Sequence, residues 1–320
     1  MMRSPLFLRV SVTDRCWMRC VYCAPASGFA PATREEVLSY QEIVRIVCAI
    51  QARYGLAQVR LTGGEPLVRA GVEELVAMLA AAGVADVALT TNGQRLAEMA
   101  GPLRQAGLNR INISLDSLNP AAFASITRGG ILEKTLTGIA AARSAGLDPV
   151  KLNTVVLRGQ NDHEVTDLVR FAIEHGCQVR FLELMPIGAA AAAFEESFVA
   201  SAEVRARLAR EFALAPLPAD PQGTSRNYVA GNGCGQTAIV GFISPSSEPF
   251  CAGCRRLRLT ATGVLIGCLA RATGVPLAPL VRGGAELDTD ALCAAIDQAL
   301  GMKRRDGEFI QPRAMVGIGG

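Results

Sequence analysis

Short runs of β-branched and aliphatic residues alternate with amphipathic helical stretches from Phe7 to about Leu184, and this alternation constrains the fold of the 320-residue chain most. Strand–helix alternation predicts a parallel sheet with right-handed crossovers. Six strands are too few to close an eight-stranded barrel, so we predict an α/β fold with a partial (β/α)6, TIM-like barrel. The expected strands are residues 7–12, 58–62, 86–91, 109–114, 149–156 and 178–183, and the expected helices are residues 40–54, 71–82, 96–106, 132–145 and 163–175.

The pattern changes after Pro186. Residues 189–193 are all alanine, a charged helical stretch follows, and a proline-rich segment extends to about Pro221. Short strands are expected near residues 241–243 and 257–260. We therefore predict a barrel over residues 1–186 and a C-terminal α+β region over residues 187–320.

Composition excludes several classes of function. The 32 basic and 29 acidic residues give a net charge of +3, which is too balanced for a nucleic-acid binder. No run of about 18 apolar residues predicts a membrane span, and the N-terminus lacks the apolar region of a signal peptide. The ten cysteines are clustered, which favours metal ligation in a reducing compartment, so we expect a cytoplasmic protein.

Three cysteines follow the first predicted strand, with three residues between Cys16 and Cys20 and two between Cys20 and Cys23. Thiolates are soft ligands that suit iron–sulfur clusters or zinc. Three of them can hold three corners of a four-iron cluster and leave the fourth iron open to a ligand. The alternative is a structural zinc site completed by a distant ligand, although such sites usually use paired short spacings.

A second set of three cysteines, Cys251, Cys254 and Cys268, lies in the C-terminal region. It again offers three thiolates, which predicts a second four-iron cluster, with zinc and a non-cysteine fourth ligand as the alternative.

Polar residues also gather at the C-terminal ends of the predicted strands, where barrel enzymes place their active sites. Gly63-Gly64-Glu65-Pro66 follows the second strand, and its glycines expose backbone groups to a close ligand. Glu65 could accept a hydrogen bond from an ammonium group, and the alternative is an ordinary glycine turn. Ser114 and Asp116 share one face at the end of the fourth strand.

Arg256 and Arg258 alternate directly after the second cysteine pair, so in a strand they face the same side. Two guanidinium groups on one face suit a polyphosphate or a purine edge, and Lys151 would point to the same barrel mouth. A solvated basic strand is the alternative.

The first cysteine loop, the Gly-Gly-Glu-Pro motif and the partial barrel together resemble the radical S-adenosylmethionine (SAM) superfamily. The stretch from Leu8 to Cys16, the second cysteine set with its Arg-Leu-Arg run, Gly241-Phe242-Ile243-Ser244-Pro245 and the terminal Gly319-Gly320 are similar to the GTP 3′,8-cyclase family of molybdenum cofactor biosynthesis. Departures from that family's pattern are Trp17, Ala24, Arg255 and the alanine run, and none removes a ligand.

This resemblance implies a role for each matching residue. Two [4Fe–4S] clusters would be held by one set each, Cys16, Cys20 and Cys23, and Cys251, Cys254 and Cys268. SAM would be contacted by Tyr22, Gly64, Ser114 and Met185. GTP would be contacted by Arg9, Arg60, Thr91, Lys151, Arg256, Leu257 and Arg258, with the tail residues Gly319 and Gly320 near it.

The resemblance also implies the reaction. The reduced first cluster would pass one electron to SAM, which would release methionine and a 5′-deoxyadenosyl radical. That radical would take hydrogen from C3′ of GTP, the C3′ radical would attack C8, and one further reduction would give 3′,8-cyclo-7,8-dihydro-GTP. The implied partners are GTP, an electron donor, a second copy in a homodimer, and the downstream cyclic pyranopterin monophosphate synthase. No general acid or base is indicated.

Two rival functions stay open at this point. A radical SAM enzyme that modifies peptides could also carry clusters in its C-terminal region, although such enzymes commonly have more cysteines there and lack the Gly-Gly tail. A non-catalytic electron-transfer protein would need fully ligated irons, whereas both sets here are one cysteine short.

Overall fold

A computed structural model describes residues 5–220, 223–233, 235–271, 273–282, 288–303, 309 and 315–318 of the chain. One twelve-stranded sheet curves through these residues in the order β12-β11-β10-β1-β2-β3-β4-β5-β6-β9-β8-β7. All neighbours from β10 to β9 are parallel, while both ends continue with antiparallel strands. The two end strands, β12 and β7, do not pair, so the barrel stays open and the predicted partial barrel is confirmed.

The strands of the barrel wall come from both predicted regions. Those of the N-terminal region are β1 (Leu6–Ser11), β2 (Leu56–Thr62), β3 (Val87–Thr91), β4 (Arg110–Ser114), β5 (Val150–Val156) and β6 (Gln178–Glu183). Those of the C-terminal region are β7 (Ala213–Pro216), β8 (Arg226–Gly231), β9 (Thr237–Ile243), β10 (Arg256–Leu259), β11 (Val264–Ile266) and β12 (Val275–Pro276).

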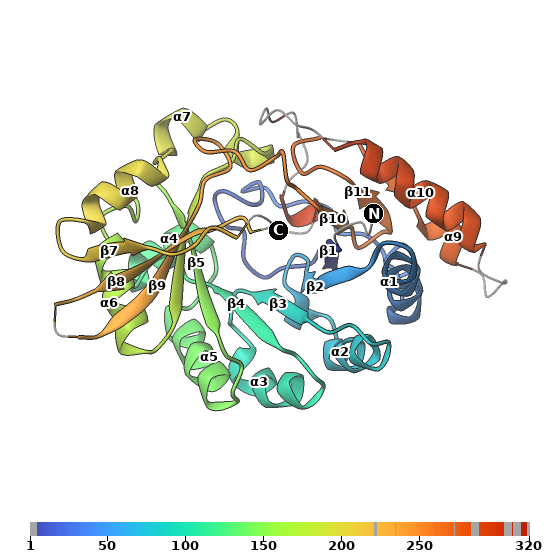
Figure 1. Ribbon diagram of the computed structural model, residues 1–320, viewed down its shortest axis with the longest axis horizontal. Coiled ribbons are helices and arrows are strands. Elements are labelled where there is room, and N and C mark those ends of the chain that lie inside the picture. Colours follow the sequence, from blue (N-terminus) through green and yellow to red (C-terminus); the bar gives the residue numbers. More distant parts are fainter. Residues whose placement is uncertain are drawn as a thin grey trace.

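Helices cover the outside of this wall (Figure 1). Those of the barrel are α1 (Tyr40–Tyr54), α2 (Val72–Ala81), α3 (Leu96–Gln105), α4 (Pro120–Thr127), α5 (Leu132–Ser144) and α6 (Val165–Glu174). The later ones are α7 (Phe194–Ser197), α8 (Ser201–Leu208), α9 (Ala278–Val281) and α10 (Thr289–Gly301). Short 3-10 helices are η1 (Pro66–Val68), η2 (Gly188–Ala190) and η3 (Met315–Ile318).

Local sequence explains why these elements form where they do. Helix α1 begins at a capping box, in which Ser39 and Glu42 each accept a hydrogen bond from the other's backbone N–H. Its apolar face, including Ile43, Ile46 and Ile50, is fully buried against the sheet. Strand β5 alternates buried and partly exposed residues, so one face packs in the core and the other lines the barrel interior.

The C-terminal region completes the barrel instead of standing apart from it. Strand β9 pairs with β6, placing Phe242 opposite Phe181, and strand β10 pairs with β1. The division at residue 186 therefore remains a prediction about sequence regions, because the sheet crosses it without a break.

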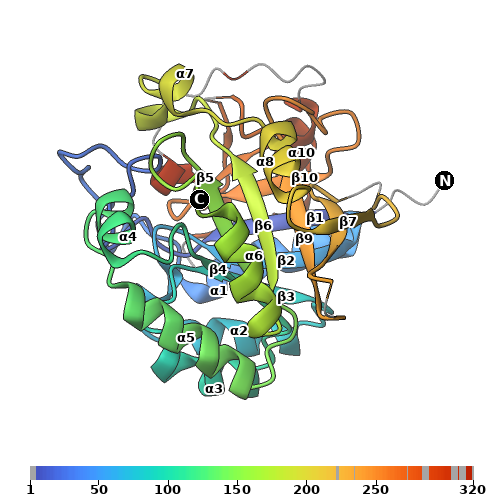
Figure 2. The same ribbon diagram turned by 90° about the vertical axis from the view of Figure 1, so that its left-hand side faces the viewer.

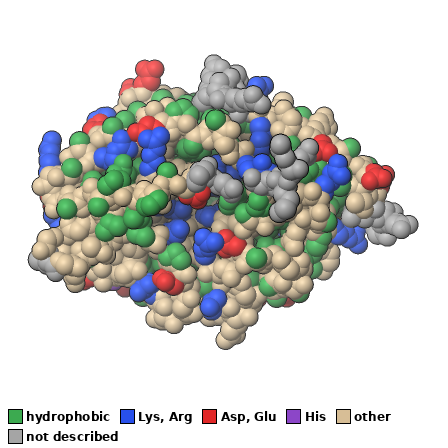
Figure 3. Space-filling view, viewed as in Figure 1, with side chains coloured by type: hydrophobic (Ala, Val, Ile, Leu, Met, Phe, Trp, Pro, Cys, Tyr) green, Lys and Arg blue, Asp and Glu red, His purple; other side chains and the backbone are tan. Residues whose placement is uncertain are grey.

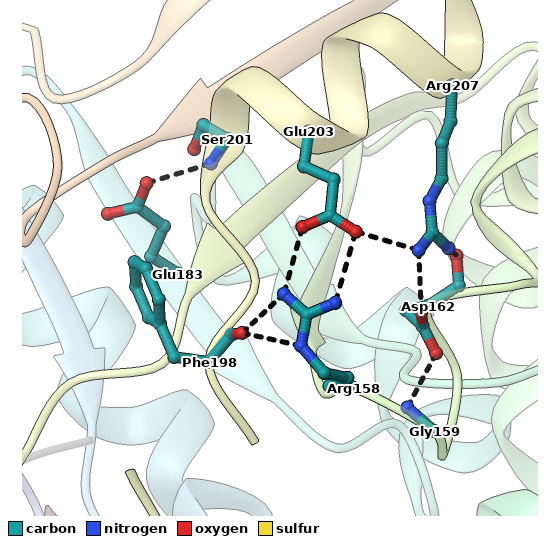
Figure 4. Close-up of polar contacts among 8 residues, drawn as sticks. All are labelled: Arg158, Gly159, Asp162, Glu183, Phe198, Ser201, Glu203 and Arg207. Atoms are coloured by element: carbon teal, nitrogen blue, oxygen red, sulfur yellow. Dashed lines mark hydrogen bonds and ion pairs between the residues drawn. The ribbon is translucent and has the colours of Figure 1, made fainter. Parts of the chain in front are cut away.

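Polar contacts fix helix α8 to the barrel (Figure 4). The guanidinium of Arg158 donates to the Phe198 carbonyl at 3.0 Å and to Glu203 at 2.9 Å. Arg207 then joins Glu203 to Asp162, at 2.8 and 2.9 Å. The start of the C-terminal region is thus held by the loop that follows β5.

Five expected helices and six expected strands are present, with bounds within two residues of those predicted. None of the helices in the described residues is long and apolar enough to cross a membrane.

Candidate active site

A cavity of about 390 Å³ opens at the centre of the barrel and collects residues from nearly every strand. Figure 3 looks into this hollow, where blue Lys and Arg side chains gather. From the C-terminal region, Asp220, Ser225, Asn227, Arg256, Arg258 and Met315 contribute to its lining. Residues at the C-terminal ends of strands, such as Thr91 and Ser114, line the cavity together with residues near strand starts, such as Lys151.

The first cysteine loop runs from the end of β1 across the cavity, and Cys16, Cys20 and Cys23 all line it. The backbone N–H of Cys23 donates to the Cys20 carbonyl at 2.9 Å, which folds the loop into a turn. Burial, followed by the charges of Cys23, Asp116 and Cys16, raises the pKa of Cys20 well above its usual value. The thiols are therefore close enough to repel one another as thiolates, which a cationic cluster would relieve.

The glycine turn after β2 forms backbone hydrogen bonds to this loop. Gly64 N–H donates to the Thr13 carbonyl at 2.6 Å, and Glu65 N–H donates to the Arg15 carbonyl at 2.8 Å. A Cβ atom on Gly64 would lie 2.3 Å from the Arg15 oxygen. Glycine is required at Gly64 because the backbone of the cysteine loop passes at contact distance.

The Glu65 carboxylate forms hydrogen bonds within the protein. Its carboxylate accepts from the backbone N–H of Leu67 at 3.0 Å, the Thr91 hydroxyl at 2.7 Å and the Asn92 N–H at 2.7 Å. Burial raises its pKa to about 7. The expected acceptor for an ammonium group is thus already occupied in tying β2 to the end of β3.

The predicted SAM contacts surround the same loop. Tyr22, Gly64, Ser114 and Met185 all line the cavity. The Tyr22 hydroxyl donates to Asp116 at 2.6 Å, and burial raises the pKa of Asp116 to about 6. This hydrogen bond joins the cysteine loop to the loop after β4.

Three arginines form a row across one wall of the cavity, here called the basic wall. Arg258, Arg9 and Arg60 are register partners on the adjacent parallel strands β10, β1 and β2. Arg258 is 9% exposed. Burial first, and then the charge of Arg9, lowers the pKa of both Arg258 and Arg60 well below the usual value. Burial removes water from these guanidinium groups, and a bound polyanion could provide hydrogen bonds in place of that water.

Arg180 is a further cation of this wall that the sequence analysis did not single out. Its guanidinium donates to Asn153 at 2.9 Å and to Asn112 at 2.6 Å, and it lines the cavity beside Lys151. Burial, followed by the charges of Arg180, Arg110 and Arg60, lowers the pKa of Lys151 to about 8. The alternation of β6 would have placed Arg180 inward, because apolar Val179 and Phe181 flank it.

Leu257 differs from its neighbours. It is fully buried in the hydrophobic core, on the face of β10 opposite to Arg256 and Arg258. A contact between GTP and Leu257 could therefore use only the backbone.

The second cysteine set lies beside the cavity. Cys254 N–H donates to the Cys251 carbonyl at 3.1 Å, and the Arg256 guanidinium, which lines the cavity, donates to the Cys254 sulfur at 3.6 Å. Lys303 Nζ donates to the same sulfur at 3.8 Å and to the Gly267 carbonyl at 3.0 Å, one residue before Cys268. Burial would raise the pKa of Cys254, but Lys303 and Arg256 outweigh it and lower that pKa.

The geometry bears on the zinc alternative. Within the described part of the chain, no three His, Cys, Asp or Glu side chains converge on a point that could hold a single metal ion. The cations beside Cys254 fit a thiolate at that position, and a thiolate is a ligand for iron–sulfur clusters and for zinc.

The chain returns to the cavity mouth at its end. Met315 lines the cavity, and Ile318 is fully buried against Ile187 and Ile266. The predicted contacts of Gly319 and Gly320 lie outside the described residues.

Comparison with known proteins agrees with this site. Residues 10–172 match the family model of the radical SAM superfamily, and residues 177–309 match the model named Molybdenum Cofactor Synthesis C. The chain therefore belongs to the radical SAM superfamily. A GTP 3′,8-cyclase of Moorella thermoacetica is 43% identical, over 98% of this chain and 97% of its own. One of Ectopseudomonas mendocina is 44% identical, over 96% and 92%. Within the superfamily, the chain is a member of the GTP 3′,8-cyclase family.

Solved structures share the fold. Streptococcus suis SuiB bound to S-adenosylmethionine has a TM-score of 0.64 and 14% identity, and the match covers 90% of this chain and 65% of SuiB. SuiB has also been solved with its precursor peptide SuiA, but 14% identity shows the fold alone. The relatives above 40% identity carry the cyclase name, so the cyclase is favoured over the peptide-modifying alternative.

Proposed function

We propose that this protein is a radical SAM GTP 3′,8-cyclase, which converts GTP to 3′,8-cyclo-7,8-dihydro-GTP in the first step of molybdenum cofactor biosynthesis. The observation that carries the proposal is one cavity that is lined by both a three-cysteine loop and a row of arginines. Cys16, Cys20 and Cys23 line it on the loop after β1, and Arg258, Arg9 and Arg60 line it on β10, β1 and β2.

Membership of the superfamily implies a [4Fe–4S] cluster and SAM, and the three thiols of the cysteine loop suit that cluster. When bound, these cofactors supply reductive radical chemistry. We assign the cluster to Cys16, Cys20 and Cys23, and SAM to Tyr22, Gly64, Ser114 and Met185. Gly64 brings bare backbone to the ligand, while the Tyr22–Asp116 hydrogen bond holds the cysteine loop in place.

We assign the triphosphate and base of GTP to the basic wall. Arg9, Arg60, Lys151, Arg180, Arg256 and Arg258 would neutralise the phosphates, because guanidinium and ammonium groups form charge-assisted hydrogen bonds to phosphate oxygens. Thr91 lies beside them at the end of β3, although its hydroxyl already donates to Glu65. Leu257 would contribute its backbone. The enclosing barrel excludes water from reactive intermediates, and the chain's main contribution is position and charge.

We assign a second [4Fe–4S] cluster to Cys251, Cys254 and Cys268. Its support is the pair of cations, Arg256 and Lys303, that donate to the Cys254 sulfur. Hydrogen bonds to cluster sulfurs raise the reduction potential. Arg256 also lines the cavity, so it would connect this cluster to the substrate.

Four further expectations belong to the same proposal. They are a homodimer, a separate electron donor, docking of the downstream cyclic pyranopterin monophosphate synthase, and a cytoplasmic location.

The test of the reaction is anaerobic incubation of reconstituted protein with SAM, GTP and dithionite. The expected products are 5′-deoxyadenosine and a cyclised nucleotide, which is an isomer of GTP and is therefore identified by chromatographic separation and NMR. A Cys16→Ala variant should form neither. 5′-Deoxyadenosine that forms only with a peptide, and never with GTP, would favour the peptide-modifying alternative.

The second cluster is tested by iron content. Wild-type protein should carry about eight irons, and a variant with Cys251, Cys254 and Cys268 all changed to Ala should carry about four and still bind SAM. About four irons in both proteins, or zinc in the wild type, would remove the second cluster from the proposal.

A further inference from the structure

Three large apolar side chains are strongly exposed in the described residues, and all three lie at the first cysteine loop. They are Trp17, 55% exposed, Ile131, 51% exposed, and Phe29, 37% exposed. A soluble surface rarely gathers such side chains at one place without an interaction to serve. Trp17 is bonded directly to Cys16, so this surface is the outer side of the cluster-binding loop.

Contacts connect the segments that carry these residues. The N–H of Arg19 donates to the Thr127 carbonyl at 3.0 Å, which pins the loop to the end of α4, and Figure 2 shows the loop in blue beside that helix. A Cβ on Gly129 would lie 3.3 Å from the Trp17 carbonyl, so the turn carrying Ile131 abuts Trp17. Gly28, next to Phe29, approaches the Arg19 guanidinium.

Hydrogen bonds fix the segment that carries Ile131. Gln94 accepts from the Ile131 N–H at 3.0 Å and donates to the Ile131 carbonyl at 2.8 Å. It also donates to the Thr135 hydroxyl at 2.7 Å. These hydrogen bonds hold the backbone that carries Ile131, so less backbone entropy is lost when a partner binds there.

Positive charge surrounds the apolar residues. Arg19, Arg128 and Lys134 are exposed and form no ion pair with any described residue. Glu133 is the acidic residue among them. Exposed arginines elsewhere are commonly paired, as Arg143 is with Asp148 at 3.1 Å. Unpaired cations around apolar side chains indicate a partner that supplies the carboxylates.

We propose that Trp17, Phe29, Ile131, Arg19, Arg128 and Lys134, here called the loop patch, dock a small acidic one-electron carrier. The inference rests on the proposed function, which needs a reduced cluster on Cys16, Cys20 and Cys23. One electron leaves the reduced carrier, which is oxidised by one electron, and enters the cluster, which is reduced by one. No bond forms or breaks, and no proton moves.

The charges favour this occupant over a second copy of the chain. Two copies that met through the same patch would place its cations against each other. An acidic carrier would instead pair its carboxylates with these cations. It would also dock where the cysteine loop alone separates the thiols from solvent, which is a short path for the electron. Trp and Arg are also the residues that most often dominate binding energy at interfaces.

The experiment follows cluster reduction by absorbance in a stopped-flow instrument, with reconstituted full-length enzyme and reduced flavodoxin, an acidic one-electron carrier. The combined variant Arg19→Glu, Arg128→Asn and Lys134→Glu should lower the second-order rate constant at least about tenfold at low salt and flatten its salt dependence. Asn suits position 128 because Arg128 has a φ of 49°. Trp17→Ala should slow reduction as well.

Two controls keep the result interpretable. Arg210→Glu, at an exposed arginine after α8, should leave the rate within about twofold. Dithionite needs no docking surface, so at high salt, which screens the charge of this anion against the variants, it should reduce every variant at the wild-type rate. Equal rates for wild type and the combined variant with flavodoxin would overturn the proposal. So would loss of self-association, or of binding to another protein, with unchanged reduction. Absence of cyclised nucleotide from wild type with dithionite would instead refute the proposed function.

Discussion

Arg9 on β1 and Arg258 on β10 lie opposite each other on neighbouring parallel strands, and they face the same cavity before any substrate is bound. Burial and the charge of Arg9 lower the pKa of Arg258, so the fold holds two guanidinium groups in an unfavourable arrangement. Sites that bind charged ligands commonly sacrifice stability in this way.

Arg258→Met should therefore stabilise the GTP-free protein and weaken its binding of GTP. Removal of one of two facing cations is expected to raise the free energy of unfolding by about 1 kcal/mol. Loss of a hydrogen bond to a charged phosphate should weaken GTP binding by about 1.5–3 kcal/mol. Thermal melts and calorimetric titration measure the two quantities. Arg210→Met is the control, and a variant that melts lower yet binds GTP normally would contradict the prediction.

GTP binding should depend on pH through Lys151, whose pKa burial and the charges of Arg180, Arg110 and Arg60 lower to about 8. Above that pH the amine becomes neutral and the triphosphate loses a cation, so affinity should fall by up to about tenfold per pH unit. The phosphate is not the cause, because its own pKa is about 6. Lys151→Arg should remove the decline between about pH 8 and 9.5, as measured by titration.

The same shift affects stability in the opposite direction. The unfolded chain holds the proton of Lys151 up to its ordinary pKa of 10.5, whereas the fold releases it at about 8. The contribution of Lys151 to the stability of the GTP-free fold therefore rises with pH across that window and is lost as pH falls through it. Parallel declines of affinity and stability above pH 8 would contradict this assignment.

Gly64→Ala should displace the first cysteine loop, because the added Cβ would overlap the Arg15 carbonyl at 2.3 Å. The expected result is loss of about half the iron and of SAM binding, measured by iron analysis and titration. Gly101→Ala is the matched control. Gly101 lies in α3 with nothing beyond its chain neighbours within 4 Å of an added Cβ, so the change should leave iron content and SAM binding unchanged. Normal iron content in Gly64→Ala would show that the loop tolerates the overlap.

Deletion of Gly319 and Gly320 should leave fold, iron content and GTP binding intact but slow formation of the cyclised nucleotide at least about tenfold, or about 1.4 kcal/mol. The reason is that Met315 and Ile318 already bring the chain to the cavity mouth. Glycines beyond them could reach the ligand with backbone alone. An added tripeptide at the C-terminus should have the same effect. Wild-type turnover from both proteins would contradict a role for the tail.

The features that could be predicted from the sequence are those that depend on local residue patterns. Strand–helix alternation identified the barrel's six strands, and the spacing of Cys16, Cys20 and Cys23 identified the loop that lines the cavity. Helix α4, which pins that loop, was not predicted, although Asn119 followed by Pro120 is a typical helix start.

Pairing between strands far apart in the sequence could not be predicted from such patterns. Nothing local in β9 or β10 indicates that they extend the barrel beside β6 and β1, because that pairing depends on the whole sheet. For the same reason the row of Arg258, Arg9 and Arg60 could not be read from sequence. The role of Glu65 also differed, since its partners Thr91 and Asn92 come from another strand.

The pairing of β1 with β10 has a consequence for how the protein is made. Arg9 and Arg258 come from opposite ends of the chain, so the first strand to leave the ribosome waits for a neighbour synthesised almost last. At typical translation speeds that delay is roughly 10–50 s. During it, one edge of a nascent sheet stays unpaired, directly beside the three thiols of the first cysteine loop. Iron loading that began before release would meet a cavity with one wall missing, so maturation of this protein is expected to follow synthesis, with the open edge shielded by chaperones until β10 arrives.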